Sequence, residues 1–459
     1  MEHFNINTLK DNARIHFIGI GGISMSGLAQ IALQKGFKVS GSDRTKSNIT
    51  DKLEGLGAKI HIGHKKELVN DADLVVHTAA VHYDNPEMAG AKELGIHLID
   101  RAEFLGALMR EYKNAVGISG THGKTTTTSM LAHALIYAET DPTISVGGEL
   151  DLIDGNIKTG ESDYFVTEAC EYTNSFLKFF PKIAVITNIE EDHLDFFSGL
   201  DEIIESFKKF ALLTKDGGVV IANGEDENIK KALSGTDCNI ITYGIDGDFT
   251  FKAKNLSYVN GYGCFDIYKN NEFYVHVDLN VPGVHNVENC LAVCAVCDCF
   301  GIDPETAAAG VKTFTGVHRR FEKKGMVLGA TVIDDYAHHP TEIIATLKAA
   351  KNVPHNKIRV VFQPHTYTRT KTLWNDFCTC FSDADELILT DIYAAREPFD
   401  GITTSEALAK AIRDGGKDCK YIGPFDEIAE YLKENLEEND IVFTMGAGTI
   451  TQLGVMIVE

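Results

Sequence analysis

The residues with the clearest chemical meaning form a short glycine-rich segment, Gly120-Thr121-His122-Gly123-Lys124-Thr125. An apolar stretch, AVGIS, precedes it and a helical pattern, TTTSMLAHALI, follows it, so we expect a turn between a strand and a helix. Backbone N–H groups and the helix N-terminus bind phosphate oxygens in such a turn. The lysine places positive charge beside a transferring phosphoryl group, and the following threonine hydroxyl can ligate Mg²⁺. The segment predicts a nucleoside triphosphate site.

The spacing of this segment differs from that of the standard phosphate-binding loop, which has four residues between its first glycine and the Gly-Lys pair. Here the gap is five residues from Gly117 and two from Gly120. A chance Gly-Lys-Thr in a surface turn is the alternative. Because the strand and the helix stand where the mechanism requires them, we favour the nucleotide site.

A second glycine turn, Gly19-Ile-Gly21-Gly22, follows an expected strand over Arg14–Ile18. A dinucleotide-binding turn would have its third glycine where Ser24 stands, and Asp43 lies where such a domain carries its ribose-binding acid. The turn could bind a nicotinamide cofactor or the pyrophosphate of another nucleotide. The missing glycine favours the second interpretation.

Two further strands end in polar residues that could face the first glycine loop. Glu168 follows the apolar run of DYFVTEACEY, and Asn188, Asp192 and His193 follow that of AVITNIEEDHLDFF. Open α/β sheets collect ligands at these strand ends, and a hard cation prefers carboxylate oxygen. A helix-capping carboxylate and a packed core imidazole are the plain alternatives for Glu168 and His193. Their occurrence together favours a metal site.

The segment PGVHNVENCLA places His285, Asn286 and Asn289 on the first turn of a helix. A side-chain amide can donate and accept together, which suits an adenine edge, although helix capping by Asn286 is an equal alternative. Next, GVHRRFE supplies two adjacent arginines, Arg319 and Arg320, which could bind phosphate or form a solvated charge pair.

Two strands of the C-terminal part are followed by further polar clusters. The strand TVIDD ends at Asp335, with His338 and His339 before a proline that suits a helix start. His365 and Arg369 follow a second strand, in FQPHTYTRTK. These residues are further candidates for a binding site.

The elements that position these residues alternate between short apolar strands and amphipathic helices, which is typical of parallel α/β sheets. Between about residues 249 and 279 the pattern changes to alternation with aromatics, which predicts antiparallel hairpins. The chain has 459 residues, more than one core usually supports. We predict three α/β domains: a Rossmann-like domain over 1–106, a central phosphate-loop domain with appended antiparallel strands over 107–317, and a Rossmann-like domain over 318–459.

The composition excludes several classes of protein. The net charge of -23 disfavours nucleic acid and acidic membrane surfaces as partners. The N-terminal segment lacks a basic stretch followed by an apolar run, and no stretch has the roughly 18 apolar residues of a membrane helix, so we expect a cytoplasmic protein. Four of the ten cysteines lie in NCLAVCAVCDCF. Zinc binding there is the less favoured interpretation; small hydrophobic side chains packed in a helix are favoured.

Several of these motifs together resemble the Mur ligase family over essentially the full length. GTHGKTTT resembles the phosphate loop of the family, whereas GIGGISMSGLA, DDYAHHPTEI, FQPHTYTRT and MGAGTI resemble its alanine-adding branch. The resemblance implies ATP-dependent ligation of L-alanine to UDP-N-acetylmuramate through an acyl phosphate, for peptidoglycan precursor synthesis, by a monomer or homodimer that needs ATP and Mg²⁺.

The resemblance also implies roles for individual residues. Thr125 would bind one Mg²⁺, and Glu168 and His193 would hold a second. Several siblings carry a modified lysine about 14 residues after the histidine, where this chain has Phe207. Lys124, His193 and Arg369 would be catalytic. The remaining ATP contacts would come from Gly120, Thr121, His122, Gly123, Thr126, Asn286, Asn289, Arg320 and Asp335. The other substrates would meet Gly19, Gly21, Gly22, Ser24, Asp43, His77, Thr78, His338, His365 and Arg369.

Three alternatives stay open at this stage. A recycling ligase of the same family would attach a preformed peptide instead of alanine, and FQPHTYTRT disfavours it by resemblance only. A nucleotide-binding regulator that has lost catalysis is disfavoured because Lys124, Glu168, His193 and Arg369 occur together. A nicotinamide dehydrogenase would use the turn at Gly19–Gly22.

Overall fold

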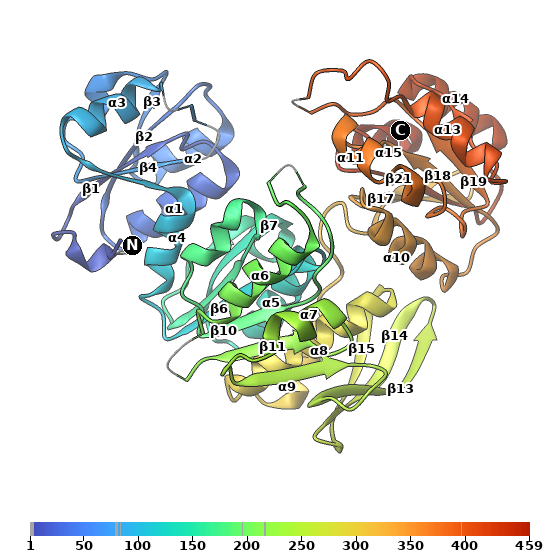
Figure 1. The fold of residues 1–459 in the computed structure, drawn as a ribbon, viewed down its shortest axis with the longest axis horizontal. Coiled ribbons are helices and arrows are strands. Elements are labelled where there is room, and N and C mark those ends of the chain that lie inside the picture. The colour runs from blue at the N-terminus through green and yellow to red at the C-terminus, as the bar shows by residue number, and fades with distance from the viewer. Residues whose placement is uncertain (1–3, 79–80, 83, 195, 215–216, 396) are drawn as a thin grey trace. The chain divides into compact units, whose positions relative to one another are not determined.

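The computed structural model describes residues 4–78, 81–82, 84–194, 196–214, 217–395 and 397–459. The chain forms two compact units. The first comprises residues 1–252, 268–272 and 290–311, and the second comprises residues 253–267, 273–289 and 312–459. Three sheets carry the fold of the described residues (Figure 1).

The N-terminal sheet has five parallel strands in the order β3-β2-β1-β4-β5. This order places the carboxyl ends of β1, β2 and β4 side by side, where ligands of open α/β sheets bind. The strands are β1 (Arg14–Ile18), β2 (Lys38–Asp43), β3 (Lys59–Ile62), β4 (Leu74–His77) and β5 (His97–Asp100). The helices are α1 (Ile23–Gln34), α2 (Asn48–Gly55), α3 (Pro86–Glu93) and α4 (Arg101–Met109).

The central sheet has ten strands in the order β15-β14-β13-β12-β11-β10-β6-β9-β7-β8. Its middle is parallel and apolar on both faces, as a sheet covered by helices requires. These strands are β6 (Asn114–Ser119), β7 (Thr143–Leu150), β8 (Gly155–Lys158), β9 (Tyr164–Glu168), β10 (Ile183–Ile186), β11 (Val219–Asn223) and β12 (Ile240–Gly244). The helices are α5 (Lys124–Tyr137), α6 (Leu200–Ala211), α7 (Glu227–Leu233), α8 (Val284–Cys299) and α9 (Pro304–Lys312).

The appended strands are β13 (Phe251–Val259), β14 (Tyr262–Lys269) and β15 (Glu272–Pro282). Two-residue turns at 260–261 and 270–271 join them, and all four turn residues have positive φ. Such turns are typical of antiparallel hairpins. Buried and accessible residues alternate along β14 and β15, so each strand has one apolar and one polar face. The predicted change of pattern after residue 249 is confirmed.

The four-cysteine segment lies on α8, where Cys290, Cys294 and Cys297 are fully buried and only Cys299 is exposed. The sulfur atoms of Cys290 and Cys294 lie 4.0 Å apart. Burial raises the pKa of Cys297 well above its ordinary value. The interpretation as packed small side chains is confirmed.

The C-terminal sheet has six strands in the order β16-β17-β21-β18-β19-β20, antiparallel only between β16 and β17. The strands are β16 (Glu322–Val327), β17 (Ala330–Asp335), β18 (Ile358–Phe362), β19 (Glu386–Leu389), β20 (Lys420–Tyr421) and β21 (Ile441–Met445). The helices are α10 (Pro340–Lys351), α11 (Tyr367–Thr372), α12 (Trp374–Phe377), α13 (Ser405–Asp414), α14 (Phe425–Asn435) and α15 (Thr451–Val458). Among the described residues, no helix has both the length and the apolar character needed to span a membrane. The predicted fold class is confirmed, and the domain boundaries stay predictions.

A buried polar cluster joins strands β1 and β2 of the N-terminal sheet to helix α3. The Glu87 carboxylate is fully buried and lies 2.6 Å from His16 Nε2 and 2.6 Å from His64 Nδ1. The Ser42 hydroxyl also donates to it. Burial raises the pKa of Glu87, but the hydrogen bonds from His16, His64 and Ser42 outweigh this effect and leave the pKa below its ordinary value.

We expect this cluster to make the stability of the protein dependent on pH. A carboxyl whose pKa is lowered by folding stabilises the protein fully above its ordinary value of 4.5, and the contribution is lost as pH falls below that value. Glu87→Gln should therefore lower the free energy of unfolding by about 1–3 kcal/mol at neutral pH and flatten its decline in acid. Denaturant titrations between neutral and acidic pH measure both effects. Glu93→Gln, on the exposed end of the same helix, should change neither.

Candidate active site

The glycine loop joins β6 to α5 as the sequence predicts, and its shape depends on two glycines. Gly120 has φ +148°, and a Cβ there would lie 1.9 Å from Thr187 Oγ1. Gly123 has φ +81° and is the N-cap of α5, so the first N–H groups of the helix face out of the turn without a capping side chain. This arrangement can bind an anion at the helix N-terminus.

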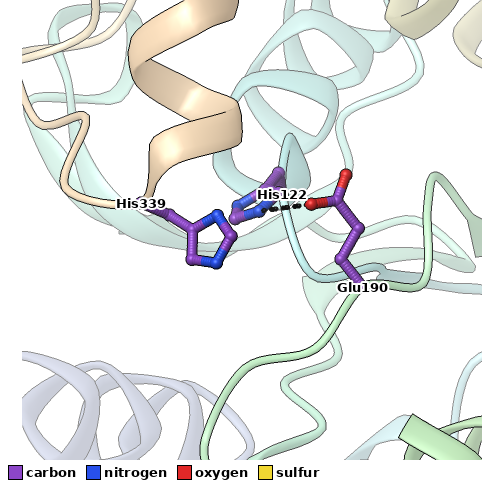
Figure 2. Close-up of side chains that lie close together, drawn as sticks. All are labelled: His122, Glu190 and His339. Carbon is purple, nitrogen blue, oxygen red and sulfur yellow. Dashed lines mark ion pairs between the residues drawn. The ribbon is translucent and has the colours of Figure 1, made fainter. Parts of the chain in front are cut away.

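The residues that follow β10 hold the glycine loop in place. The Thr187 hydroxyl and the Asn188 amide donate to the carbonyl of His122, and Asn188 Oδ1 accepts from the N–H of His122. The N–H of Glu190 donates to Thr121 Oγ1. Figure 2 shows the ion pair between His122 Nε2 and Glu190 Oε2, which are 3.6 Å apart. The side chain of Asn188 therefore positions the loop by bonding to the backbone of His122.

Lys124 is the first residue of α5, and its ammonium group points back over the loop. It donates to the carbonyls of Gly120 and Thr121 and lies 3.0 Å from Glu171 Oε2. Burial lowers the pKa of Lys124, but the charge and hydrogen bond of Glu171, together with the charges of Cys170 and Glu168, outweigh this effect and leave the pKa above its ordinary value, so the ammonium form is favoured. A permanent positive charge at this position suits a phosphate group.

Glu171 is a functional candidate that the sequence analysis missed. It lies three residues beyond Glu168, at the start of the 3-10 helix η4 (Tyr172–Lys178), and is buried. Its Oε1 lies 3.7 Å from His193 Nε2, so it connects the lysine with the predicted metal histidine. The motif EACEY contains both acids, and the second one could have been considered on the same grounds as the first.

The three predicted metal residues lie around this lysine on three different elements. Thr125 is on the first turn of α5, and the negative charge of Glu168 contributes to raising the pKa of Lys124. Glu168 Oε1 accepts a hydrogen bond from the N–H of Gly147. His193 has φ +54° and packs on the ring of Tyr172 at 4.7 Å. Carboxylate, hydroxyl and imidazole groups such as these are ligands that Mg²⁺ accepts.

Phe207, at the position of the modified lysine of sibling ligases, is a core residue. It is fully buried on α6 and packs edge-to-face on Phe176, with ring centroids 5.3 Å apart. This position therefore offers the metal no ligand.

The N-terminal glycine turn brings together most of the residues predicted around it. The N–H of Gly21 donates to Asp43 Oδ2 at 2.8 Å, and a Cβ on Gly19 would lie 2.8 Å from the Thr78 methyl carbon. His77 Nδ1 lies 3.2 Å from the carbonyl oxygen of Thr78. Gly22 is the N-cap of α1, and Ser24 is exposed on the first turn of that helix. Asp43 thus fixes the turn itself.

In the second unit, Arg319 and Arg320 have different roles. Arg319 Nη2 donates to the carbonyls of Gly446 and Gly448, so it holds the loop after β21. Arg320 lies over the ring of Tyr336, and its Nη1 is 3.4 Å from Glu342 Oε1. Burial lowers the pKa of Arg320, but the nearby carboxylates raise it more. The structure thus contradicts the interpretation of Arg319 and Arg320 as a solvated charge pair.

Asp335 is a buried acid at the carboxyl end of β17. It accepts hydrogen bonds from the N–H groups of Phe321 and Ala337, both at 2.8 Å. Burial raises the pKa of Asp335 to about 6, although the charge of Arg320 acts in the opposite direction. A carboxyl with a pKa near 6 can gain or lose its proton near neutral pH, so it can donate a hydrogen bond to a polar ligand or accept one from it.

His338, His365 and Arg369 come together as predicted. The ring centroids of the two histidines are 5.9 Å apart, and Arg369 Nη1 donates to His365 Nδ1 at 3.0 Å. Burial lowers the pKa of His338 to about 4, and burial and the charge of Arg369 lower that of His365. Both imidazoles are therefore neutral at neutral pH. His339 is the N-cap of α10 and forms a capping box with Glu342, which the sequence analysis also missed.

The two asparagines at the start of α8 are buried and bonded to each other. Asn289 Nδ2 donates to Asn286 Oδ1, and Asn286 Nδ2 donates to the carbonyl of Pro282. The Asn286 side chain thus accepts from another side chain of α8 and donates to the last residue of β15. Burial lowers the pKa of His285 to about 4.

Three family profiles match the chain. They are the Mur ligase family, catalytic domain, over residues 14–113, the Mur ligase middle domain over residues 118–297, and the Mur ligase, glutamate ligase domain over residues 319–448. The chain therefore belongs to the Mur ligase family, and it is a ligase.

Comparison with individual relatives narrows the choice within the Mur ligase family. The chain is 55% identical over 454 residues to the UDP-N-acetylmuramate–L-alanine ligase of Clostridium botulinum, covering 98% of this chain and 99% of the relative. It is 54% identical to the enzyme of that name from Caldanaerobacter subterraneus, covering 97% of each. The solved UDP-N-acetylmuramate-alanine ligase of Thermotoga maritima has a TM-score of 0.78 at 31% identity, covering 97% of this chain and 98% of that one. A murein peptide ligase from Psychrobacter arcticus shares the fold, with a TM-score of 0.67 at 24% identity over 97% of this chain and 98% of that one.

Proposed function

We propose that this protein is an ATP-dependent ligase that joins L-alanine to the carboxylate of UDP-N-acetylmuramate, releasing ADP and phosphate, in peptidoglycan precursor synthesis in the cytoplasm. The observation that carries this proposal is the 55% identity over the whole length to a relative with that name. The lysine at the start of α5 supports it independently, because a positive charge beside a glycine turn at a helix N-terminus suits phosphate groups.

The glycine loop is the proposed site of the ATP phosphates. Backbone N–H groups from Gly120 to Thr126 would bind the phosphates, and Lys124 would bind the transferring group. Thr125, Glu168 and His193 would hold Mg²⁺, with Glu171 available beside them. When bound, Mg²⁺ neutralises charge on the phosphate oxygens. Four further residues stay predicted contacts of ATP: Asn286, Asn289, Arg320 and Asp335.

The N-terminal glycine turn is the proposed site of the UDP pyrophosphate. Gly19, Gly21 and Gly22 keep the backbone free of side chains beside the N-terminus of α1, which favours an anion. Thr78 lies against the turn. This assignment replaces the nicotinamide interpretation and uses the same residues.

Two steps account for the reaction. The muramoyl carboxylate attacks the γ-phosphorus of ATP, and ADP leaves, which gives an acyl phosphate. The amine of alanine then attacks the acyl carbon, and phosphate leaves from a tetrahedral intermediate. The first step brings two anions together, and Lys124 is placed to stabilise the charge that develops.

The direct test is ADP release with UDP-N-acetylmuramate present, scanning the twenty amino acids and the tripeptide that a recycling ligase would attach. We expect L-alanine to give the highest kcat/KM, with glycine and serine weaker by about 10–200-fold because one methyl group contributes about 1–3 kcal/mol. Faster turnover with the peptide would identify the recycling activity. ADP release with no amino acid preference would contradict the proposal.

Arg369 is the proposed contact to the alanine carboxylate, because its guanidinium is oriented by His365. Arg369→Ala should raise KM for L-alanine by about 10–100-fold, the loss of one charged hydrogen bond, while KM for ATP stays unchanged. Steady-state kinetics with each substrate varied in turn measures this. Lys371→Ala, two residues further along α11, is the matched control.

A further inference from the structure

A second group of metal-binding side chains lies on the appended hairpin of β14 and β15. Cys264, His276 and Asp278 each offer one ligand atom, and these atoms lie within 4.8 Å of one another. The two positions on β15 are separated by one residue, so both belong to the polar face of the strand. The ligation chemistry proposed above uses none of these residues.

The separations match those around a tetrahedral zinc ion. Cys264 Sγ lies 3.5 Å from His276 Nε2, and His276 Nε2 lies 3.4 Å from Asp278 Oδ1. Bond lengths of about 2.3 Å to sulfur, about 2.05 Å to nitrogen and about 2.1 Å to oxygen give tetrahedral edges of about 3.6 Å and about 3.4 Å for these two pairs. A zinc ion would thus fit with little movement of the ligands.

The neighbours of these ligands also have the arrangement typical of zinc sites. His276 Nδ1 donates to Asp266 Oδ1 at 2.7 Å, so the neutral ring presents its Nε2 lone pair to Cys264 and Asp278. Such a carboxylate–histidine pair orients the ring and raises its basicity in many zinc proteins. Lys312 Nζ holds the other oxygen of Asp278 at 3.0 Å. Asn255 Nδ2 in turn donates to Asp266 Oδ2.

We propose that Cys264, His276 and Asp278 form a zinc site, with Asp266 orienting the histidine and a water molecule as the fourth ligand. The side chains of His276 and Asp278 are 51% and 44% exposed, which leaves the fourth position open to solvent. The thiolate and imidazole select a borderline-soft ion such as Zn²⁺ over Mg²⁺, which prefers oxygen alone. The site joins two strands and is independent of the nucleotide chemistry.

The test uses the full-length protein and Co²⁺ as a spectroscopic substitute for Zn²⁺. We expect wild-type protein to develop thiolate-to-cobalt charge-transfer absorption that saturates at about one ion per chain and disappears when Zn²⁺ is added. Cys264→Ser should abolish the absorption. Asp266→Asn should weaken Zn²⁺ affinity, measured by competition with a chromogenic chelator, by about 10–100-fold.

Cys299→Ser is the matched control, because it removes an exposed thiol on another element and should leave the absorption unchanged. Absence of the band in wild-type protein, or its persistence in Cys264→Ser, would overturn the proposal. So would its loss in Cys299→Ser. If Cys264→Ser does not fold, protection of Cys264 in wild-type protein from iodoacetamide by Zn²⁺, mapped by peptide mass, decides the question: protection supports the site, and equal labelling refutes it.

Discussion

Lys124→Ala should reduce kcat by about 10³-fold or more, the largest effect that we expect from a single substitution. The ammonium group is fixed by two loop carbonyls and by Glu171, so it needs no reorganisation to meet a phosphoryl group. Removing a charged donor from a comparable phosphoryl or oxyanion site costs about 10²–10³-fold or more. ADP release at saturating ATP, UDP-N-acetylmuramate and alanine measures the effect.

Two measurements distinguish a catalytic defect of Lys124→Ala from a loss of folded structure. Lys113→Ala removes an exposed lysine just before β6 and should keep normal turnover. Thermal unfolding of Lys124→Ala should stay cooperative, because the buried Glu171 carboxylate still has a partner in this variant. Its Oε1 lies 3.7 Å from His193 Nε2. A Lys124→Ala enzyme with near-normal kcat would show that the loop does not bind the transferring phosphate.

Gly120→Ala should abolish nucleotide binding, because the loop cannot keep its shape with a side chain there. The new Cβ would lie 1.9 Å from Thr187 Oγ1, and the φ of +148° is unfavourable for alanine. Thr187 also bonds to the carbonyl of His122, so its displacement would disturb the whole turn. We expect affinity for ATP to fall by at least about 100-fold, measured by calorimetry with Mg²⁺ present.

Gly155→Ala separates the effect of the clash from that of the backbone angle. Gly155 has φ +142°, nearly the same as Gly120, but a Cβ there meets no atom within 4 Å. This variant should lose a little stability, about 1–3 kcal/mol, and keep normal affinity for ATP. Equal loss of binding in both variants would mean that general destabilisation, and not the loop, is responsible.

The sequence predicted the elements and the loops of this protein because both have local signals. The strand before Gly120 and the helix after it are contiguous in the chain, and the turn at Gly19–Gly22 has the same form. His338, His365 and Arg369 were grouped correctly because parallel strands β17 and β18 end at one edge of the sheet.

The partners of these residues were harder to predict, because they depend on contacts between distant segments. Glu171 follows a strand by three residues, on an irregular 3-10 helix whose direction no periodicity indicates. Glu87 lies 71 residues from His16, and no pattern in α3 shows that its carboxylate turns inward. The hydrogen bond that Asn289 donates to Asn286 likewise depends on burial.

The buried cysteines of α8 have a consequence for experiments on the folding of this protein. A thiol reacts with alkylating reagents as the thiolate, and burial keeps Cys297 in the thiol form inside the helix. Cys290 and Cys294 are equally inaccessible. Their rate of alkylation under native conditions therefore reports how often this helix detaches from its sheet, so that mass spectrometry can measure local opening without any engineered label.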